Sequence, residues 1–410
     1  MSEFKGIEYL RRKLAQKRTR VLMRYDYYEM KNLSKYFTEN VPENLRYVKE
    51  TLGWCGKAVD SLADRLVFRE FENDNFDINE IFKMNNSDIL FDSAILSAAI
   101  ASCSFIYISP QYEGIPKLQV IDGANATGVL DPITGMLTEG YAVLERENGP
   151  VSNPIKEVYM VPGRVDILIG GKVVQSIPNN APYALLVPIV YRPDAMRPFG
   201  HSRISRACMS LTDSAVRTLM RSEISAEYYS FPQKYILGMS PDAEKMDKAK
   251  ASITTLLRID KDEDGDKPVV GQFTQQSMSP YTEQLRTMAA LFAGETGLTL
   301  DDLGFVTDNP SSAEAIKASH ESLRLTARKA QRTFGSGFLN AGYLAACVRD
   351  DYEYERSAMY LTKPTWEPVF EPDSAMFGAI GDGAFKINQV VPGYFDASNL
   401  RGLTGIDSKA

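Results

Sequence analysis

Histidine is the scarcest of the residues that usually carry catalysis: the 410-residue chain has two, His201 and His320. A Ser-His-Asp triad is defined by geometry, and the adjacent serines Ser202 and Ser319 do not supply it. A two-histidine metal site would need both side chains, which we place on separate predicted helices. The carboxylates are scattered, and no pair is singled out by its spacing. The sequence therefore predicts no catalytic residue and no metal site.

Cysteine is also sparse, and the four cysteines form no CxxC pair. Without paired spacing, a zinc site and a disulfide framework are both disfavoured. Most of the cysteines lie in apolar or alanine-rich stretches, so we expect buried free thiols, which fits a reducing cytosol. The cysteines are Cys55, Cys103, Cys208 and Cys347.

Signatures of nucleotide and calcium binding are missing. The Gly-Gly-Lys run at 170–172 is not a phosphate loop, because the earlier glycine is absent and Val173 stands where a hydroxyl would reach magnesium. The alternating aspartates at 260–266 resemble a calcium loop, but Gly271 stands where the EF-hand pattern requires Glu. We interpret 260–266 as a solvated acidic loop and expect no cofactor.

Long hydrophobic runs and an excess of positive charge are absent as well. The N-terminus lacks the apolar core of a signal peptide. The most apolar stretch, 89–108, is interrupted by Asp92 and several serines, so no membrane span is expected. The net charge is -7. Because a protein that grips nucleic acid broadly is normally basic, any contact with nucleic acid must be local or weak.

The length predicts two or three domains at roughly 100–200 residues each.

The N-terminal part has helical patterns at 3–31 and 43–70 and a helical pair within 77–103. The first helix is rich in Lys and Arg, which suggests either a nucleic-acid-binding arm or a solvated or subunit-contacting helix. We favour the second interpretation because acidic residues, among them Glu8 and Asp26, interrupt the charge. The expected core stripe of the second helix is Trp54, Ala58, Val59, Leu62, Leu66 and Val67.

Short β-rich runs follow the helices and are separated by turn signals. Runs at roughly 8–12-residue spacing joined by short turns predict an antiparallel sheet. The two glycines at 170–171 are typical of a hairpin turn. The runs are 104–108, 118–121, 140–144, 158–161, 165–169 and 172–174.

The longest uninterrupted helical pattern lies between His201 and Phe231, where neither Pro nor Gly occurs. Apolar residues recur there at helical spacing. Such a helix would reach roughly 40 Å at 1.5 Å per residue, which is long for a compact domain. Downstream we expect a strand at 234–237, a helix at 280–293, a loop at 298–312, a helix from 313 that Gly335 and Gly337 interrupt, a strand at 358–361 and a helix at 373–389.

Several short motifs occur in a fixed order along the chain. They are 25–28 (YDYY), 54–60 (WCGKAVD), 199–204 (FGHSRI), 232–235 (PQKY), 279–281 (SPY) and 309–316 (NPSSAEAI). In this order and spacing, from about residue 20 to 390, the chain resembles the portal (connector) proteins of tailed bacteriophages.

The resemblance implies a ring, usually of twelve subunits, that forms the channel for DNA at one vertex of the capsid. It also implies an α+β fold of portal type, with an α/β wing, a stem of long helices, a small α/β clip, a tunnel loop and a short helical crown. The expected parts are an N-terminal basic helix at 1–24, the wing at 25–202 with 350–400 returning to it, stem helices at 203–229 and 280–297, the clip at 230–279, the tunnel loop at 298–312, a long helix and short crown at 313–349, and a tail at 401–410.

The partners implied by the resemblance are the terminase large subunit, a head–tail adaptor, the major capsid or scaffolding protein, and double-stranded DNA passing through the channel. The protein would reside in the virion after assembly in the cytoplasm of the bacterial host. No catalysis is expected, since a separate ATPase would power packaging. Two other classes remain open: a metal-dependent nuclease or phosphotransferase, and a non-portal oligomeric adaptor.

Channel residues are also implied by the resemblance. Thr307, Asp308 and Asn309 would face DNA in the tunnel loop, whose aspartates and lack of Lys or Arg suit contact without gripping. Lys317 and Arg324 would form a weak basic belt, with ordinary surface exposure as the alternative.

Ring contacts would come from the first stem helix. Subunits in a closed ring meet through heterologous contacts. Arg217 and Arg221, one helical turn apart, would pair with carboxylates of the neighbouring subunit. The alternative is a pair of Arg217 with Asp213 in the same helix.

Overall fold

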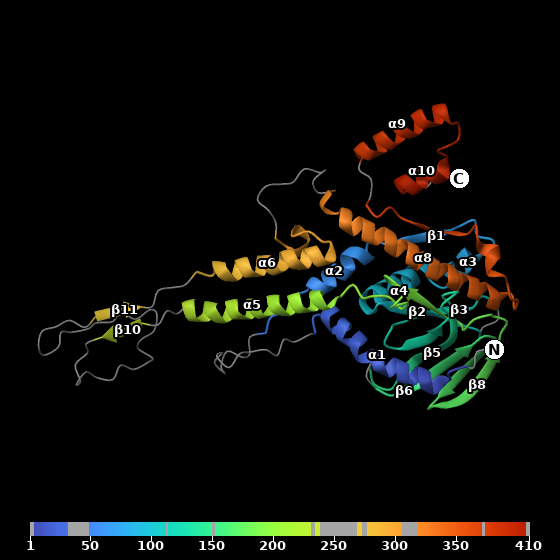
Figure 1. Cartoon of the computed structure of the whole chain (residues 1–410), viewed down its shortest axis with the longest axis horizontal. Coiled ribbons are helices and arrows are strands. Elements are labelled where there is room, and N and C mark those ends of the chain that lie inside the picture. Colours follow the sequence, from blue (N-terminus) through green and yellow to red (C-terminus); the bar gives the residue numbers. More distant parts are fainter. Residues whose placement is uncertain are drawn as a thin grey trace, which may run out of the picture. The chain divides into compact units, whose positions relative to one another are not determined.

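The chain divides by its contacts into two compact units. Unit 1 comprises Met1–Asn32, Gly53–Met209 and Phe292–Ala410, and unit 2 comprises Leu33–Leu52 and Ser210–Leu291. The chain contains both helices and strands (Figure 1), and the strand pairs in the described residues are antiparallel, which agrees with the expected α+β class. The computed structural model describes residues 4–31, 49–111, 114–149, 152–230, 234–237, 269–272, 277–305, 318–370 and 374–406.

Two antiparallel sheets in unit 1 contain the predicted β-rich runs. All of these runs form strands, so the prediction is confirmed. The strands of the five-stranded sheet follow sequence order, and the three-stranded sheet has the order β3-β2-β9. The strands are β2 (Cys103–Ser109), β3 (Lys117–Ile121), β4 (Ala126–Leu130), β5 (Leu137–Arg146), β6 (Pro154–Val161), β7 (Arg164–Ile169), β8 (Lys172–Pro178) and β9 (Leu186–Val190).

Strands β4 and β9 were missed because each contains a residue that disfavours strands. In β4, a Cβ on Gly128 would lie 2.6 Å from the Glu139 carbonyl oxygen, so the close approach of β5 requires glycine. In β9, Pro188 has no N–H for the ladder, but β9 pairs with β2 alone at the edge of its sheet. Both residues therefore occupy positions where a strand tolerates them.

The hairpin between β7 and β8 turns at the predicted glycines. Ile169 pairs with Lys172 across the turn. Gly170 and Gly171 have φ values of 56° and 80°. Positive φ at both central residues is the requirement of a type I′ turn, which explains the two glycines.

The helices of the N-terminal part agree with the predicted pattern, except that the second is shorter. Its residues 43–48 lie outside the described part of the chain, and the helix itself ends at Ala63. The apolar stripe is buried as far as Leu66, but Val67 is 45% exposed, so its assignment to the core is wrong. Beyond the helix end, the helical period no longer decides which side chain faces the core. The helices are α1 (Ile7–Tyr28), α2 (Trp54–Ala63), α3 (Ile78–Lys83) and α4 (Ser87–Ala101).

Two buried carboxylates of the five-stranded sheet hold α1 in place. The backbone N–H groups of Lys5 and Gly6, just before the helix, donate to Glu139 at 2.7 and 2.8 Å. The Arg11 guanidinium donates from Nε and Nη2 to the two oxygens of Glu157, at 3.1 and 2.7 Å, and this pair raises the pKa of Arg11. This packing favours the interpretation that the basic helix is not a free nucleic-acid-binding arm.

Helix α8 (Glu321–Arg349) runs without a break through Gly335 and Gly337, so the predicted interruption is wrong. Both glycines are sites of close packing. A Cβ on Gly335 would lie 2.6 Å from Pro364 Cγ, and one on Gly337 would lie 2.8 Å from Ile189 Cδ1. Tertiary packing therefore outweighs the low helix propensity of glycine, about 1 kcal/mol relative to alanine.

The segment after α8 returns to the N-terminal part of unit 1. The predicted strand at 358–361 is wrong, because Arg356–Met359 form a 3₁₀ helix. The strand lies later, at β12 (Lys363–Trp366), and pairs antiparallel with β1 (Phe68–Glu72). Two helices follow, and the first confirms the predicted helix at 373–389; they are α9 (Ser374–Val390) and α10 (Ala397–Thr404).

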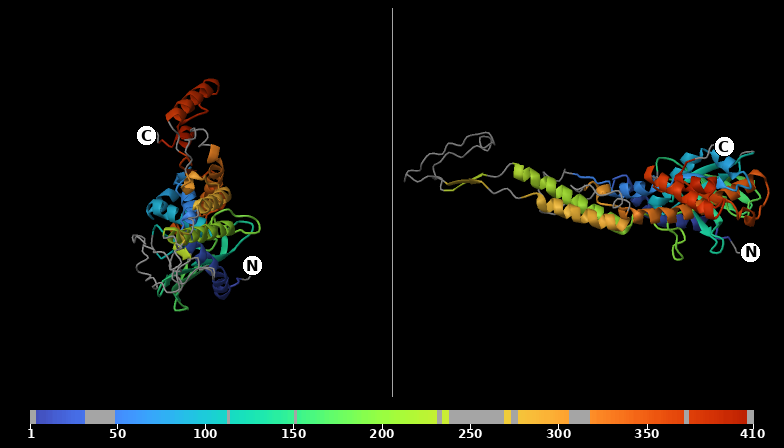
Figure 2. Two further views of the ribbon diagram at one scale, coloured as in Figure 1. Left: turned by 90° about the vertical axis from the view of Figure 1, so that its left-hand side faces the viewer. Right: turned by 90° about the horizontal axis from the view of Figure 1, so that it is seen from above.

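The long helical pattern forms α5 (Arg206–Ser230), and the next predicted helix forms α6 (Ser279–Thr296). Within unit 2 the two helices lie side by side (Figure 2). Ser225 Oγ is 2.8 Å from Tyr281 Oη in this contact. Between the helices in sequence, the predicted strand β10 (Lys234–Leu237) pairs antiparallel with β11 (Val269–Gln272). The acidic run at 260–266 lies outside the described residues.

The four cysteines are buried and free, as predicted. Burial raises the pKa of the Cys103, Cys208 and Cys347 thiols. Within the part of the chain that the structure describes, no helix combines the length and apolar character needed to cross a bilayer.

We expect Gly335→Ala to destabilise the protein, because the new methyl group would overlap the Pro364 ring. Over-packing of this kind costs about 1–3 kcal/mol. Gly381→Ala in α9 is the matched control, since nothing lies within 4 Å of an added Cβ there. Thermal unfolding should show a lower Tm for Gly335→Ala and an unchanged or higher Tm for Gly381→Ala. Equal Tm values for Gly335→Ala and the wild type would contradict the packing argument.

Candidate functional site

The 199–204 motif forms a turn against the end of β9. Gly200 has a φ of 74°, and a Cβ there would lie 2.1 Å from the Tyr191 carbonyl oxygen. The His201 N–H donates to the same carbonyl at 2.9 Å. Glycine is therefore required for the chain to turn back at this point. Phe199 packs against Phe105, with ring centroids 6.2 Å apart.

Arg203 is the centre of the motif and is 7% exposed. Its Nε donates to the Ala58 carbonyl in α2, and its Nη2 donates to the Thr296 carbonyl at the end of α6, at 2.8 Å. Its Nη1 lies 3.5 Å from the Tyr191 hydroxyl. The carbonyls at the C-terminal end of a helix lack partners within the helix and carry partial negative charge, so the Thr296 carbonyl suits a buried cation.

Two serines beside Arg203 complete the turn. Ser202 Oγ donates to the Ile100 carbonyl at 2.5 Å and accepts from the Ile204 N–H at 3.0 Å. Ser205 Oγ accepts from the Cys208 N–H at 3.2 Å, so Ser205 is the N-cap of α5. The cap explains why α5 begins at Arg206, later than the predicted 203.

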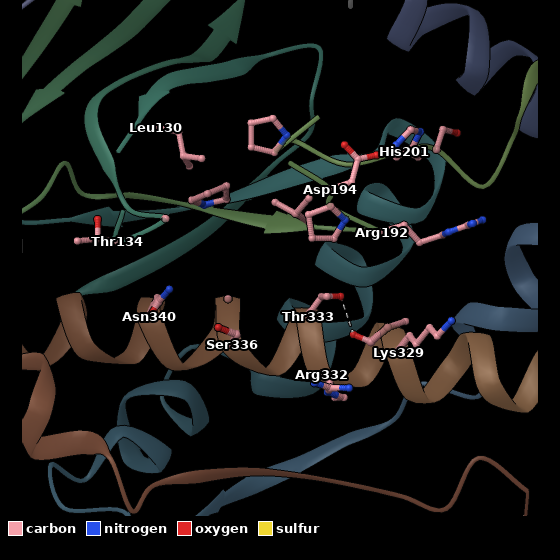
Figure 3. Close-up of a pocket in the computed structure, with 18 of the residues that line it drawn as sticks. Leu130, Thr134, Arg192, Asp194, His201, Lys329, Arg332, Thr333, Ser336 and Asn340 are labelled. Carbon is pink, nitrogen blue, oxygen red and sulfur yellow. Dashed lines mark hydrogen bonds and ion pairs between the residues drawn. The ribbon is translucent and has the colours of Figure 1, made fainter. Parts of the chain in front are cut away.

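A cleft of about 1150 Å³ opens beside this motif (Figure 3). One wall is the connection between β9 and α5, with Arg192, Asp194 and His201. The opposite wall is α8. The side chains that α8 contributes are Lys329, Ala330, Arg332, Thr333, Ser336 and Asn340.

The chemistry of the cleft is polar. His201 Nε2 lies 2.5 Å from Asp194 Oδ2, and this hydrogen bond lowers the pKa of Asp194. Arg192, Lys329 and Arg332 are exposed around the cleft.

The two histidines lie in different surroundings, and Ser202, which follows His201, donates to the Ile100 carbonyl rather than to a histidine. His320 is separate from the cleft, with Nδ1 3.8 Å from Asp302 Oδ2. The described ranges contain no group of three His, Cys, Asp or Glu side chains placed to hold a metal ion.

The predicted ring-contact residues both lie on α5. Arg217 is half-buried, and its Nη2 donates to Ser214 Oγ at 2.8 Å. Arg221 is exposed. Their pairing with a neighbouring subunit stays a prediction.

The predicted channel residues are placed only in part. Arg324 lies in α8, where its Nε and Nη2 both donate to Glu321 at 2.7 Å and lower the pKa of that carboxyl. Its charge is therefore paired within its own helix. The other predicted channel residues, Thr307, Asp308, Asn309 and Lys317, lie outside the described residues.

Arg203 was missed as a candidate residue, although it stands inside a motif that carried the resemblance. An arginine within a helical pattern is normally assigned to the exposed face of the helix because it is charged. The sequence did contain a signal for the start of the helix. In the Ser-Arg-Ile-Ser order at 202–205, the second serine is a typical helix N-cap. A cap at that position places Arg203 before the helix.

Comparison with known proteins supports the resemblance to phage portals. The chain is 25% identical to the portal protein of Mycobacterium phage L5 over 384 residues, covering 88% of this chain and 77% of the relative. It is 25% identical to the portal protein of Mycobacterium phage D29 over 382 residues, with the same coverage. No family model matches the chain. The resemblance to tailed-phage portal proteins is thereby confirmed by two relatives that carry that name.

Solved structures with a similar chain include parts of gene transfer agent particles. A chain of the virion of a native particle covers 87% of this chain and 90% of its own length, at 13% identity and a TM-score of 0.46. A chain of the neck of a native particle, computed with C12 symmetry, has the same coverage and identity and a TM-score of 0.44.

We expect Arg203→Met to destabilise the protein strongly, because it removes the buried charged group that donates to the Ala58 and Thr296 carbonyls. Hydrogen bonds to charged groups contribute about 1.5–3 kcal/mol each. The free energy of unfolding, measured by denaturant titration, should fall by at least about 3 kcal/mol. Arg206→Met, at an exposed position three residues later, is the control and should change it by less than about 0.5 kcal/mol. Equal losses in the two variants would contradict the role of Arg203.

Proposed function

We propose that this chain is the subunit of a phage portal, a homo-oligomeric ring at one vertex of the capsid through which double-stranded DNA enters and leaves. The observation that carries the proposal is the match to two portal proteins across 88% of the chain. The two long helices of unit 2 and the small strand pair between them in sequence are consistent with it. A ring of about twelve copies is the form that the resemblance favours.

The parts of a portal subunit can be assigned to this chain on the same basis. We assign the wing to 25–202 with 350–400, and the stem to 203–229 and 280–297. We assign the clip to 230–279, which includes β10 and β11. The assignment also has the basic helix at 1–24, the tunnel loop at 298–312, the long helix and short crown at 313–349, and the tail at 401–410. Pairing of β12 with β1 supports the return of the C-terminal segment to the wing.

The partners follow from the proposed position in the particle. The ring would dock the terminase large subunit on one side during packaging and a head–tail adaptor afterwards, and it would contact the major capsid or scaffolding protein. It would be assembled in the host cytoplasm and remain in the virion. Its own role would be structural, with a separate ATPase as the motor.

The contacts between the channel and DNA would be weak because the subunit carries a net negative charge. DNA must slide, and every cation that neutralises a phosphate adds affinity that resists sliding. A subunit with a net charge of -7 avoids adding such affinity at every position around a ring. In this proposal Thr307, Asp308 and Asn309 touch DNA, and Lys317 and Arg324 form a weak basic belt.

Purified protein should form rings with a central hole in negative-stain microscopy, and native mass spectrometry should give a multiple of 45.7 kDa. Arg221→Glu places a repelling charge at each proposed subunit contact, so the fraction of subunits in rings should fall at a matched concentration. Lys172→Glu, exposed at the β7–β8 turn, is the control and should assemble normally. A monodisperse monomer with magnesium-dependent nuclease activity would replace the portal proposal with the enzymatic alternative.

Asp308→Lys should hinder DNA passage, because it adds one cation per subunit to a loop that has neither Lys nor Arg. Particles carrying this variant should package less DNA than wild type, with a larger deficit at low salt. Asp308→Asn removes the negative charge without adding a cation and should package nearly normally. Full packaging by both variants would show that the loop does not touch DNA.

A further inference from the structure

A cavity of about 450 Å³ lies between α1 and the five-stranded sheet, away from the cleft beside Arg203. Its charged lining consists of Arg11 and Arg18 from α1, Arg146 from β5 and Glu157 from β6. Three arginines and one glutamate leave a formal charge of +2. A concave site with excess positive charge is suited to an anion.

Several arginines of this chain bind a carboxylate through the same edge of the guanidinium, the one formed by Nε and Nη2. The Nε and Nη2 atoms of a guanidinium point in the same direction and match the two oxygens of an oxyanion. Arg11 presents this edge to Glu157, Arg324 presents it to Glu321, and Arg349 presents it to Asp350 at 2.8 and 2.7 Å. An empty edge of this kind is therefore informative.

Arg18 has such an empty edge. Its Nε and Nη2 atoms are both buried, and neither has a hydrogen-bond partner among the described residues. Leaving charged donors buried and unpaired is costly, because the water they lose is not replaced. Arg18 lines the cavity, so a slight movement of its side chain would bring this edge to an anion there, which would supply the missing acceptor.

Arg146 adds a second cation to the same site. It is held by Asn125 Oδ1 at 2.9 Å and by the Ser152 carbonyl at 2.7 Å, both neutral groups. Burial and the nearby charge of Arg18 lower the pKa of Arg146. Arg18 and Arg146 therefore lie close together although their positive charges repel each other.

The nearby carboxylates are already engaged. Glu157 is bound by Arg11 and by the Tyr141 hydroxyl. Asp122 accepts from the Ala124 N–H at 2.6 Å and from Asn125 Nδ2 at 2.7 Å. Neither is bonded to the free edge of Arg18.

We propose that Arg18 and Arg146 bind a small, doubly charged tetrahedral oxyanion of the phosphate class in this cavity, a role beyond that of a portal subunit. The formal charge of +2 favours a dianion over a carboxylate. The Arg18 edge is covered, so the anion must be small enough to enter with a slight movement of that side chain. This favours a free ion over the backbone of DNA. Bound there, the anion would fasten the middle of α1 to the sheet.

The test is isothermal titration of the purified full-length protein at constant ionic strength, with inorganic phosphate, sulfate, acetate and a short DNA duplex as separate titrants. Phosphate and sulfate should bind, and Arg18→Gln should raise the Kd at least about tenfold, since it removes a charge-assisted bidentate contact. Arg18→Lys keeps the charge without the two-pronged edge and should also weaken binding. Arg20→Gln, exposed on the same helix, is the matched control and should leave the Kd unchanged.

A stability measurement separates binding from folding. In phosphate-free buffer, Arg18→Gln should have a Tm at least equal to that of the wild type, because it removes unpaired buried donors. Phosphate should raise the Tm of the wild type by more than that of the variant at the same concentration. Absence of phosphate binding by the wild type, equal binding by Arg18→Gln, acetate binding as tight as phosphate binding, or an effect of Arg18→Gln on duplex binding alone would each overturn the proposal.

Discussion

The buried charge of Arg203 is the constraint on which the arrangement of unit 1 depends most directly. Its acceptors among the described residues are neutral: the carbonyls of Ala58 and Thr296 and the hydroxyl of Tyr191. These groups replace the water that the guanidinium loses on burial, and removing them would leave a buried charge without compensation. The end of α6, the middle of α2 and the end of β9 are thereby held in one arrangement.

Directional bonds organise the other side of unit 1 as well. Glu139 and Glu157 project from neighbouring strands and receive the start of α1 and its first arginine. Leu10 and Leu14 pack against Tyr141 and Val143 beneath the same helix. Apolar burial supplies the driving force for the packing, but it is not directional. The carboxylates determine where along the sheet the helix lies.

Much of the fold was predictable because it depends on local signals. Alternating strands, the glycine turn at 170–171 and the length of α5 follow from periodicity and backbone preference. The errors came from tertiary contacts. Gly335 was predicted to interrupt a helix, but it lies inside α8, where the absence of a side chain makes room for Pro364. Arg203 was missed because periodicity assigns a charged residue to the surface. For the candidate site, Arg217, Arg221 and Arg324 were correctly placed on helices, but a pairing between subunits is not visible in one chain.

The burial of all four cysteines has a practical consequence for measuring motion in this protein. Burial withdraws the thiols from solvent and keeps Cys103, Cys208 and Cys347 protonated at neutral pH. A maleimide dye reacts with an exposed thiolate, so the native chain offers little background labelling. A single cysteine introduced at an open position of α9 would therefore carry a dye at one defined point. Energy transfer between labelled copies would then report distances within an assembly without removal of any native cysteine.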